Sequence, residues 1–259
     1  MITTRNLCLE LGDKTVLDHI SMYLKEGEIL ALCGPNGAGK TSLLAAIAGE
    51  YQGCNSDVYY WDQSIDVFSA TELVNMRVVL EQNPSLSTDY TLEQLLEMGL
   101  PLALSERDLV QLKMQVMRQL GLLDHQGKFV SDMSGGQRHR AHFARVVLRL
   151  LANKRLGHDS FLFVDEPTAS LDIAYQIILM KILSQLRDEG VGVLVVLHDL
   201  NLAAQFADRV ILMKQGRIIH DNSPAQVLTE DALGHVFETK ILVEQSKSGQ
   251  VVIQPDLAA

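Results

Sequence analysis

Cysteine and tryptophan are scarce in this 259-residue chain, with three and one residues respectively. The thiols, Cys8, Cys33 and Cys54, show no C-x-x-C spacing and have no neighbouring histidine pattern. A disulfide framework and a zinc site are therefore not predicted, because both rely on such spacings. The cysteines are expected to be reduced and mostly buried.

Long apolar runs and basic charge are also missing. No segment approaches the roughly 18 consecutive apolar residues of a membrane-spanning helix, and the first five residues lack the apolar core of a signal peptide. The net charge is −10, whereas a nucleic-acid partner requires a basic face. The sequence predicts a soluble, cytoplasmic protein without a nucleic-acid partner, and its 47% hydrophobic residues suffice for a core.

A glycine-rich stretch near the start matches the phosphate-loop pattern G-x-x-x-x-G-K-[ST]. An apolar run at 29–33 precedes it and a helix-forming run at 42–48 follows it, as the pattern requires. The predicted nucleotide-binding residues are Gly34, Pro35, Asn36, Gly37, Ala38, Gly39, Lys40, Thr41 and Ser42.

The residue types of this stretch suit a nucleoside triphosphate. Gly34, Gly37 and Gly39 allow the backbone to curl so that amide groups and a helix N-terminus face phosphate oxygens. Lys40 adds a positive charge near the β- and γ-phosphates, and the Thr41 hydroxyl is a ligand for Mg²⁺. The alternative, an ordinary glycine-rich turn, does not explain the flanking strand and helix.

The remaining chain divides by pattern into β-rich and helical parts. Residues 2–33 alternate in hydrophobicity around a turn at Gly12, and a short strand is predicted at 58–61. Residues 83–158 carry apolar residues at helical spacing. Within them, a helix running to about Leu151 begins at Ser134, Gly135, Gly136 and Gln137, which form either a simple N-cap or a second phosphate site.

Two buried strands are predicted to end in polar side chains. The run 161–164 leads into Asp165 and Glu166, and the run 193–197 leads into His198. Since ligands bind at the carboxyl ends of parallel strands, Asp165 is expected to hold Mg²⁺ and Glu166 to polarise the attacking water. His198 is expected to contact the γ-phosphate, with a structural histidine as the alternative.

Taken together, these motifs resemble those of the ATPase subunits of ATP-binding-cassette (ABC) transporters, over nearly the whole chain. Residues 34–41 resemble the Walker A loop, Gln82 the Q-loop glutamine and residues 134–137 the signature motif. Residues 161–166 resemble Walker B, 170–172 the D-loop, and His198 the switch histidine. The order of the six motifs along the chain identifies the family.

The resemblance implies an α/β P-loop NTPase fold with a single ABC ATPase domain, 1–259. Residues 1–82 and 159–259 would form a RecA-like core with an antiparallel β lead-in, and 83–158 a helical subdomain. It implies ATP hydrolysis with Glu166, His198 and Gln82 as catalytic residues, and Mg²⁺ held by Thr41, Gln82 and Asp165. A second copy would supply Ser134, Gly135, Gly136 and Gln137 across a homodimer, with Asp172 reaching over the interface.

The resemblance also implies a transmembrane permease dimer, a substrate-binding protein and a place on the cytoplasmic side of the inner membrane. Residues 198–209 are similar to the ATPases of haem, siderophore and cobalamin importers, and 165–176 favour the haem members. A soluble non-transport ATPase and an exporter ATPase are the alternatives. The chain departs from the family at Leu11, where an aromatic residue usually stacks on adenine, at Met133, and at Arg138 and His139.

Overall fold

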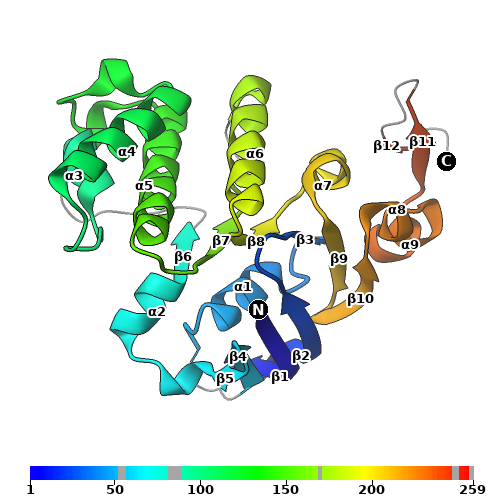
Figure 1. The fold of residues 1–259 in the computed structure, drawn as a ribbon. Coiled ribbons are helices and arrows are strands. Elements are labelled where there is room, and N and C mark those ends of the chain that lie inside the picture. Colours follow the sequence, from blue (N-terminus) through cyan, green and yellow to red (C-terminus); the bar gives the residue numbers. More distant parts are fainter. Residues whose placement is uncertain (52–56, 81–88, 169–170, 247–250, 257–259) are drawn as a thin grey trace.

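The computed structural model describes residues 1–259 except 52–56, 81–88, 169–170, 247–250 and 257–259. A twisted sheet of six strands crosses the centre of the protein (Figure 1). Five strands are parallel and the edge strand β10 runs antiparallel to β9. In spatial order the strands are β10 (Arg217–Asn222), β9 (Arg209–Lys214), β3 (Ile29–Cys33), β8 (Gly192–Val196), β7 (Phe161–Asp165) and β6 (Arg77–Leu80).

The central strands read as uninterrupted apolar runs because both faces of the sheet are covered. Along β3, Ile29, Ala31 and Cys33 join one buried cluster, which includes residues of the long helices. The alternate residues, Leu30 and Leu32, join a second buried cluster, which lies on the opposite face. Burial of both faces therefore fixes the register of β3. The loop that follows β3 consequently lies at the edge of the sheet.

A smaller antiparallel sheet covers the second face together with helix α1 (Lys40–Ile47). Its strands are β1 (Ile2–Leu11), β2 (Lys14–Leu24), β4 (Val58–Tyr60) and β5 (Gln63–Ser64). The predicted antiparallel lead-in is confirmed. The strand predicted at 58–61 ends one residue earlier, because Trp61 has φ 47° and starts a turn.

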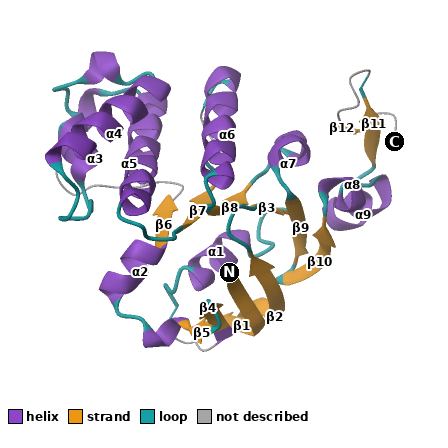
Figure 2. Cartoon of the chain, in the orientation of Figure 1, coloured by secondary structure: helices purple, strands orange, loops and turns teal. Residues whose placement is uncertain are grey.

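Helices cover the first face of the sheet (Figure 2). This face carries α5 (Gly135–Arg155), α6 (Ile173–Asp188) and α7 (Leu200–Phe206). Two further helices, α3 (Leu92–Glu97) and α4 (Glu106–Gln119), pack on α5. Helix α5 extends four residues beyond the end expected near Leu151. Lys154 and Arg155 stabilise this last turn because their charges lie near the carbonyl end of the helix dipole.

The remaining elements flank this core. Helix α2 (Ala70–Met76) leads into β6, and α8 (Pro224–Val227) and α9 (Glu230–Phe237) follow β10. A hairpin of β11 (Ile241–Gln245) and β12 (Val251–Pro255) follows α9. The Asn201 amide of α7 makes two hydrogen bonds with the Ile253 backbone, at 2.8 and 3.1 Å, which fixes this hairpin on the core.

None of the helices that the structure describes combines the length and the apolarity needed to cross a bilayer.

Candidate nucleotide-binding site

The loop between β3 and α1 has a conformation that only glycine accommodates at two positions. Gly34 has φ 147°, and a Cβ atom there would lie 2.2 Å from the Met213 carbonyl oxygen. Gly39 has φ 99°, and its Cβ would lie 2.9 Å from the Val16 carbonyl oxygen. The glycines therefore permit both the turn and its close contact with β2 and β9, as the phosphate-loop pattern requires.

Lys40 begins α1 and extends back beneath this loop. Its Nζ donates hydrogen bonds to the carbonyl oxygens of Gly34, at 2.9 Å, and Pro35, at 3.0 Å. Burial lowers the pKa of Lys40, and the nearby negative charges of Glu166 and Asp165 oppose that shift. The ammonium group is thus held in place by the loop, where an anionic ligand would be its strongest partner.

Thr41 and Asp165 meet at the same sheet edge and fit a divalent cation. Asp165 is 4% exposed, and its Oδ1 atom has no hydrogen-bond partner among the described residues. Burial raises the pKa of Asp165, while a hydrogen bond from the Thr41 side chain lowers it. The Thr41 hydroxyl and the unpaired Asp165 carboxylate oxygen are both oxygen ligands, which Mg²⁺ prefers. Gln82, the third predicted ligand, lies outside the described residues.

Glu166 and His198 are brought together because β7 and β8 are parallel neighbours. Glu166 directly follows β7 and has φ 47°, a left-handed conformation uncommon for a residue with a side chain. The His198 Nε2 lies 2.5 Å from the Glu166 Oε1. Since a carboxylate only accepts hydrogen bonds, the imidazole donates this one. The pair provides a base whose position is fixed by a second polar group.

A cleft of about 560 Å³ joins most of these groups. It is lined by Leu11, Lys14, Val16, Asn36, Gly37, Ala38, Gly39, Lys40, Thr41, Ser42, Glu166 and His198. Lys14 and Val16 were missed by sequence reasoning, although both follow the predicted hairpin turn at Gly12. They contribute because β2 packs against the phosphate loop at Gly39.

Leu11 is 45% exposed at the mouth of this cleft, and we expect Leu11→Tyr to increase the affinity for ATP. An aromatic ring that stacks on a base contributes about 1–3 kcal/mol, so Kd should fall by at least about fivefold. Calorimetric titration with ATP and GTP measures the effect. Leu102→Tyr, at a fully exposed leucine outside the cleft, is the control. Unchanged Kd values in Leu11→Tyr would contradict a nucleobase position beside residue 11.

The predicted signature residues do not line the cleft. Ser134 is exposed and caps helix α5, where its Oγ accepts from the Gln137 amide at 3.3 Å and Gln137 accepts from the Ser134 amide at 2.9 Å. Gly135 and Gly136 form the first turn of the same helix. Asp172 is an exposed N-cap of α6 and accepts a hydrogen bond from the Tyr175 amide at 3.0 Å.

Comparison with known proteins places these features in one family. The family profile described as ABC transporter matches residues 17–169. The hemin import ATP-binding protein HmuV of Vibrio cholerae is 38% identical over 244 residues, covering 93% of this chain and 93% of the relative. The protein of the same name from Rhodopseudomonas palustris strain HaA2 is 32% identical over 95% of this chain and 94% of the relative.

Solved structures agree with the fold. A metal-chelate type ABC transporter in an inward-facing conformation matches with a TM-score of 0.79 at 21% identity, over 99% of this chain and 97% of that chain. A dimeric bacterial ABC transporter cassette matches with a TM-score of 0.69 at 25% identity, over 86% and 99%. The α/β architecture predicted from the sequence is therefore confirmed.

Proposed function

Because the chain belongs to the ABC transporter family of ATPases, we propose that it is the ATP-hydrolysing subunit of a haem importer. The observation that carries this proposal is the cleft in which the phosphate loop faces the Glu166–His198 pair. A phosphate cradle alone supports binding only. A base held opposite the cradle supports attack by water on the γ-phosphate.

We infer the following roles for the residues of the cleft. The loop amides and Lys40 bind the phosphates, and Glu166 orients the attacking water and accepts its proton. His198 holds the Glu166 carboxylate through its Nε2, and with ATP bound the same N–H would turn to the γ-phosphate oxygens. Thr41 and Asp165 would hold Mg²⁺, which neutralises charge on the β- and γ-phosphates when bound. Gln82 is proposed to help position that ion and the water.

We propose that each complete site is formed by two copies of the chain. The exposed N-terminus of α5, with Ser134, Gly135, Gly136 and Gln137, would close over ATP bound by the partner, and Asp172 would contact the interface. Support comes from the position of these residues outside their own cleft and from their place at the N-terminus of α5, since helix N-termini bind anions. A solved relative described as a dimeric cassette is consistent with this arrangement.

Ser134→Arg tests this role. The variant should bind ATP with a Kd within about twofold of the wild type, because the residue lies outside the cleft. It should nevertheless lose at least about tenfold in ATPase rate, since a bulky side chain replaces the small hydroxyl that would donate to a phosphate oxygen. Binding and steady-state ATPase assays measure both quantities. Ser105→Arg removes the N-cap of α4 in the same way and is the matched control. A Ser134→Arg protein with the wild-type rate would refute the in-trans role.

A permease partner is supported by a second cavity, of about 280 Å³, between β6 and helix α5. Arg77, Arg145 and Arg149 line it, and the Nε atoms of Arg77 and Arg149 are buried without hydrogen-bond partners in the part of the chain that the structure describes. Burial lowers the pKa of Arg149, and the positive charges of Arg145 and Arg77 lower it further. Carboxylates on an exposed segment of the permease would suit this cavity. The chain would then lie on the cytoplasmic side of the inner membrane.

Haem is the proposed cargo because relatives at 32–38% identity are named hemin import proteins. Ferric siderophores and cobalamin are the alternatives. The test is to purify the chain with its own permease, reconstitute the complex in lipid, and measure ATPase stimulation by binding proteins loaded with each cargo. Stimulation by the haem-loaded protein alone supports the proposal. Stimulation only by a siderophore- or cobalamin-loaded protein would reassign the cargo and leave the ATPase role intact.

A further inference from the structure

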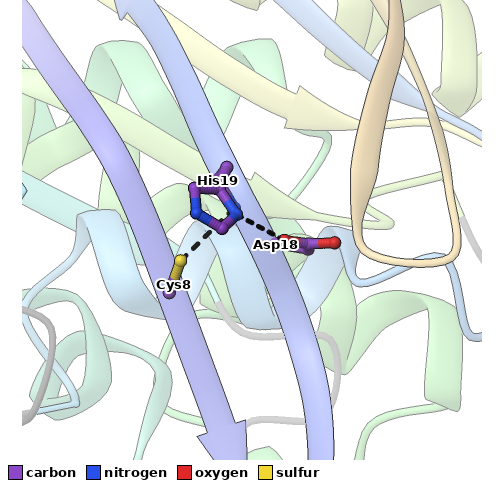
Figure 3. Close-up of side chains that lie close together, drawn as sticks. All are labelled: Cys8, Asp18 and His19. Carbon is purple, nitrogen blue, oxygen red and sulfur yellow. Dashed lines mark hydrogen bonds and ion pairs between the residues drawn. The ribbon is translucent and has the colours of Figure 1, made fainter.

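The β1–β2 hairpin places a thiol, a carboxylate and an imidazole close together (Figure 3). None of the three side chains lines the nucleotide cleft. One possible ligand atom from each of Cys8, Asp18 and His19 lies within 4.8 Å of the others. Cys8 is exposed, and the side chains of Asp18 and His19 are 24% and 74% exposed. The cluster is therefore open to an ion from solvent.

An irregularity of the hairpin creates this cluster. Leu7 pairs with Ile20 and Leu9 pairs with Leu17, so that Cys8 alone faces both Asp18 and His19. In a regular strand, two consecutive side chains point to opposite faces. Here the extra residue is accommodated because His19 has φ 52°, and β-bulges of this kind redirect side chains at functional sites.

Hydrogen bonds join the three groups to one another and to their neighbours, including one from the Cys8 thiol to the Asn6 carbonyl oxygen at 3.4 Å. The His19 Nδ1 lies 2.5 Å from the Asp18 Oδ1, while the Asp18 Oδ2 accepts from the Arg217 Nε at 2.6 Å. The Cys8 sulfur accepts from the His19 backbone amide at 3.4 Å. Arg217 thus orients the carboxylate through one oxygen and leaves the other facing the imidazole. Charge-assisted contacts of this kind position metal ligands from outside the coordination sphere.

We propose that Cys8, Asp18 and His19 bind one Zn²⁺ ion, with solvent as the fourth ligand. Thiolate sulfur, imidazole nitrogen and carboxylate oxygen are the ligands that Zn²⁺ takes in tetrahedral sites, at about 2.0–2.3 Å. The ion replaces the proton between the Asp18 Oδ1 and the His19 Nδ1 and the proton of the Cys8 thiol, while Arg217 stays on the Oδ2. Rotation of the exposed His19 ring brings the three ligands to coordination distance.

The linear sequence gives no sign of this site. Cys8 is ten residues from Asp18, which matches no short ligand spacing typical of zinc sites, and the sequence therefore predicts no zinc site. Only the pairing of β1 with β2 and the bulge bring the ligands together. Since a coordinating thiol must be deprotonated, the affinity for Zn²⁺ should increase with pH.

Co²⁺ is the probe for the test, because tetrahedral Co²⁺ bound by a thiolate absorbs in the near ultraviolet whereas Zn²⁺ is silent. The full, untagged chain is titrated without nucleotide. We expect one Co²⁺ per chain, a near-ultraviolet band that disappears in Cys8→Ser, and displacement of Co²⁺ by Zn²⁺. His19→Gln should raise the Kd for Co²⁺ by at least about tenfold, because loss of even a supporting residue of a metal site weakens metal binding by that factor.

Two control variants separate this site from others. His158→Gln changes an exposed histidine outside the cluster, and Asp165→Asn removes the carboxylate at the phosphate loop. Both should retain the band and the Kd of the wild type. Thermal unfolding of Cys8→Ser without metal verifies that the hairpin is intact. A wild-type chain without a saturable band, or a band of unchanged intensity in Cys8→Ser, would overturn the proposal.

Discussion

Replacing Glu166 with glutamine is expected to lower kcat for ATP hydrolysis by a factor of about 10²–10⁴, the usual contribution of a general base. Glutamine has nearly the same shape and can still meet the His198 ring, but its amide does not accept a proton from water. ATP binding should remain within about twofold of the wild type, since the phosphate contacts come from the loop and Lys40.

The same variant should accumulate as an ATP-bound dimer. If hydrolysis reopens the dimer, a chain that binds ATP without hydrolysing it stays closed. Size-exclusion chromatography with light scattering, with and without Mg·ATP, measures this change. Glu244→Gln, at an exposed glutamate on β11, is the control. A Glu166→Gln protein with wild-type kcat would show that another group activates the water.

Lys40→Ala is expected to weaken ATP binding by at least about 30-fold, since removing one partner of a buried charged contact costs about 2–5 kcal/mol. Lys40 is 6% exposed, and its ammonium group is held by the carbonyl oxygens of Gly34 and Pro35. Its loss removes both the positive charge and the anchor of the loop. Calorimetric titration with Mg·ATP measures the affinity, and thermal unfolding reports on the fold.

Lys14 offers a matched control for this experiment. It is a lysine that lines the same cleft from the hairpin, but it is exposed and lies outside the phosphate loop. Lys14→Ala should therefore change Kd by only about threefold, the scale of an exposed charge contact. Equal losses in the two variants would mean that general positive charge binds ATP rather than the specific position of Lys40. Wild-type affinity in Lys40→Ala would refute the phosphate-loop assignment.

Much of this site is predictable because its parts are local. The loop needs glycine at fixed positions, and its glycines, Lys40 and Thr41 lie within eight consecutive residues. Glu166 and His198 are distant in sequence, yet each follows a buried apolar run. Since parallel strands end at one sheet edge, their proximity follows once the strands are recognised.

The parts that the sequence does not reveal depend on packing between distant segments. Lys14 and Val16 reach the cleft only because β2 packs on the loop at Gly39. Strand β11 has no distinct pattern of its own and is fixed by pairing with β12. The Cys8 cluster depends on a bulge, which shifts the strand register by one residue and leaves no mark in spacing.

The most direct test of the composite site is to mix two inactive variants. In a dimer of one Glu166→Gln chain and one Ser134→Arg chain, one site carries both defects and the other carries neither. ATPase rates are measured for each variant and for the equimolar mixture, combined before ATP is added. Random pairing should restore about one quarter of the wild-type sites in the mixture. A mixture no more active than the sum of the separate variants would contradict a site shared between two copies.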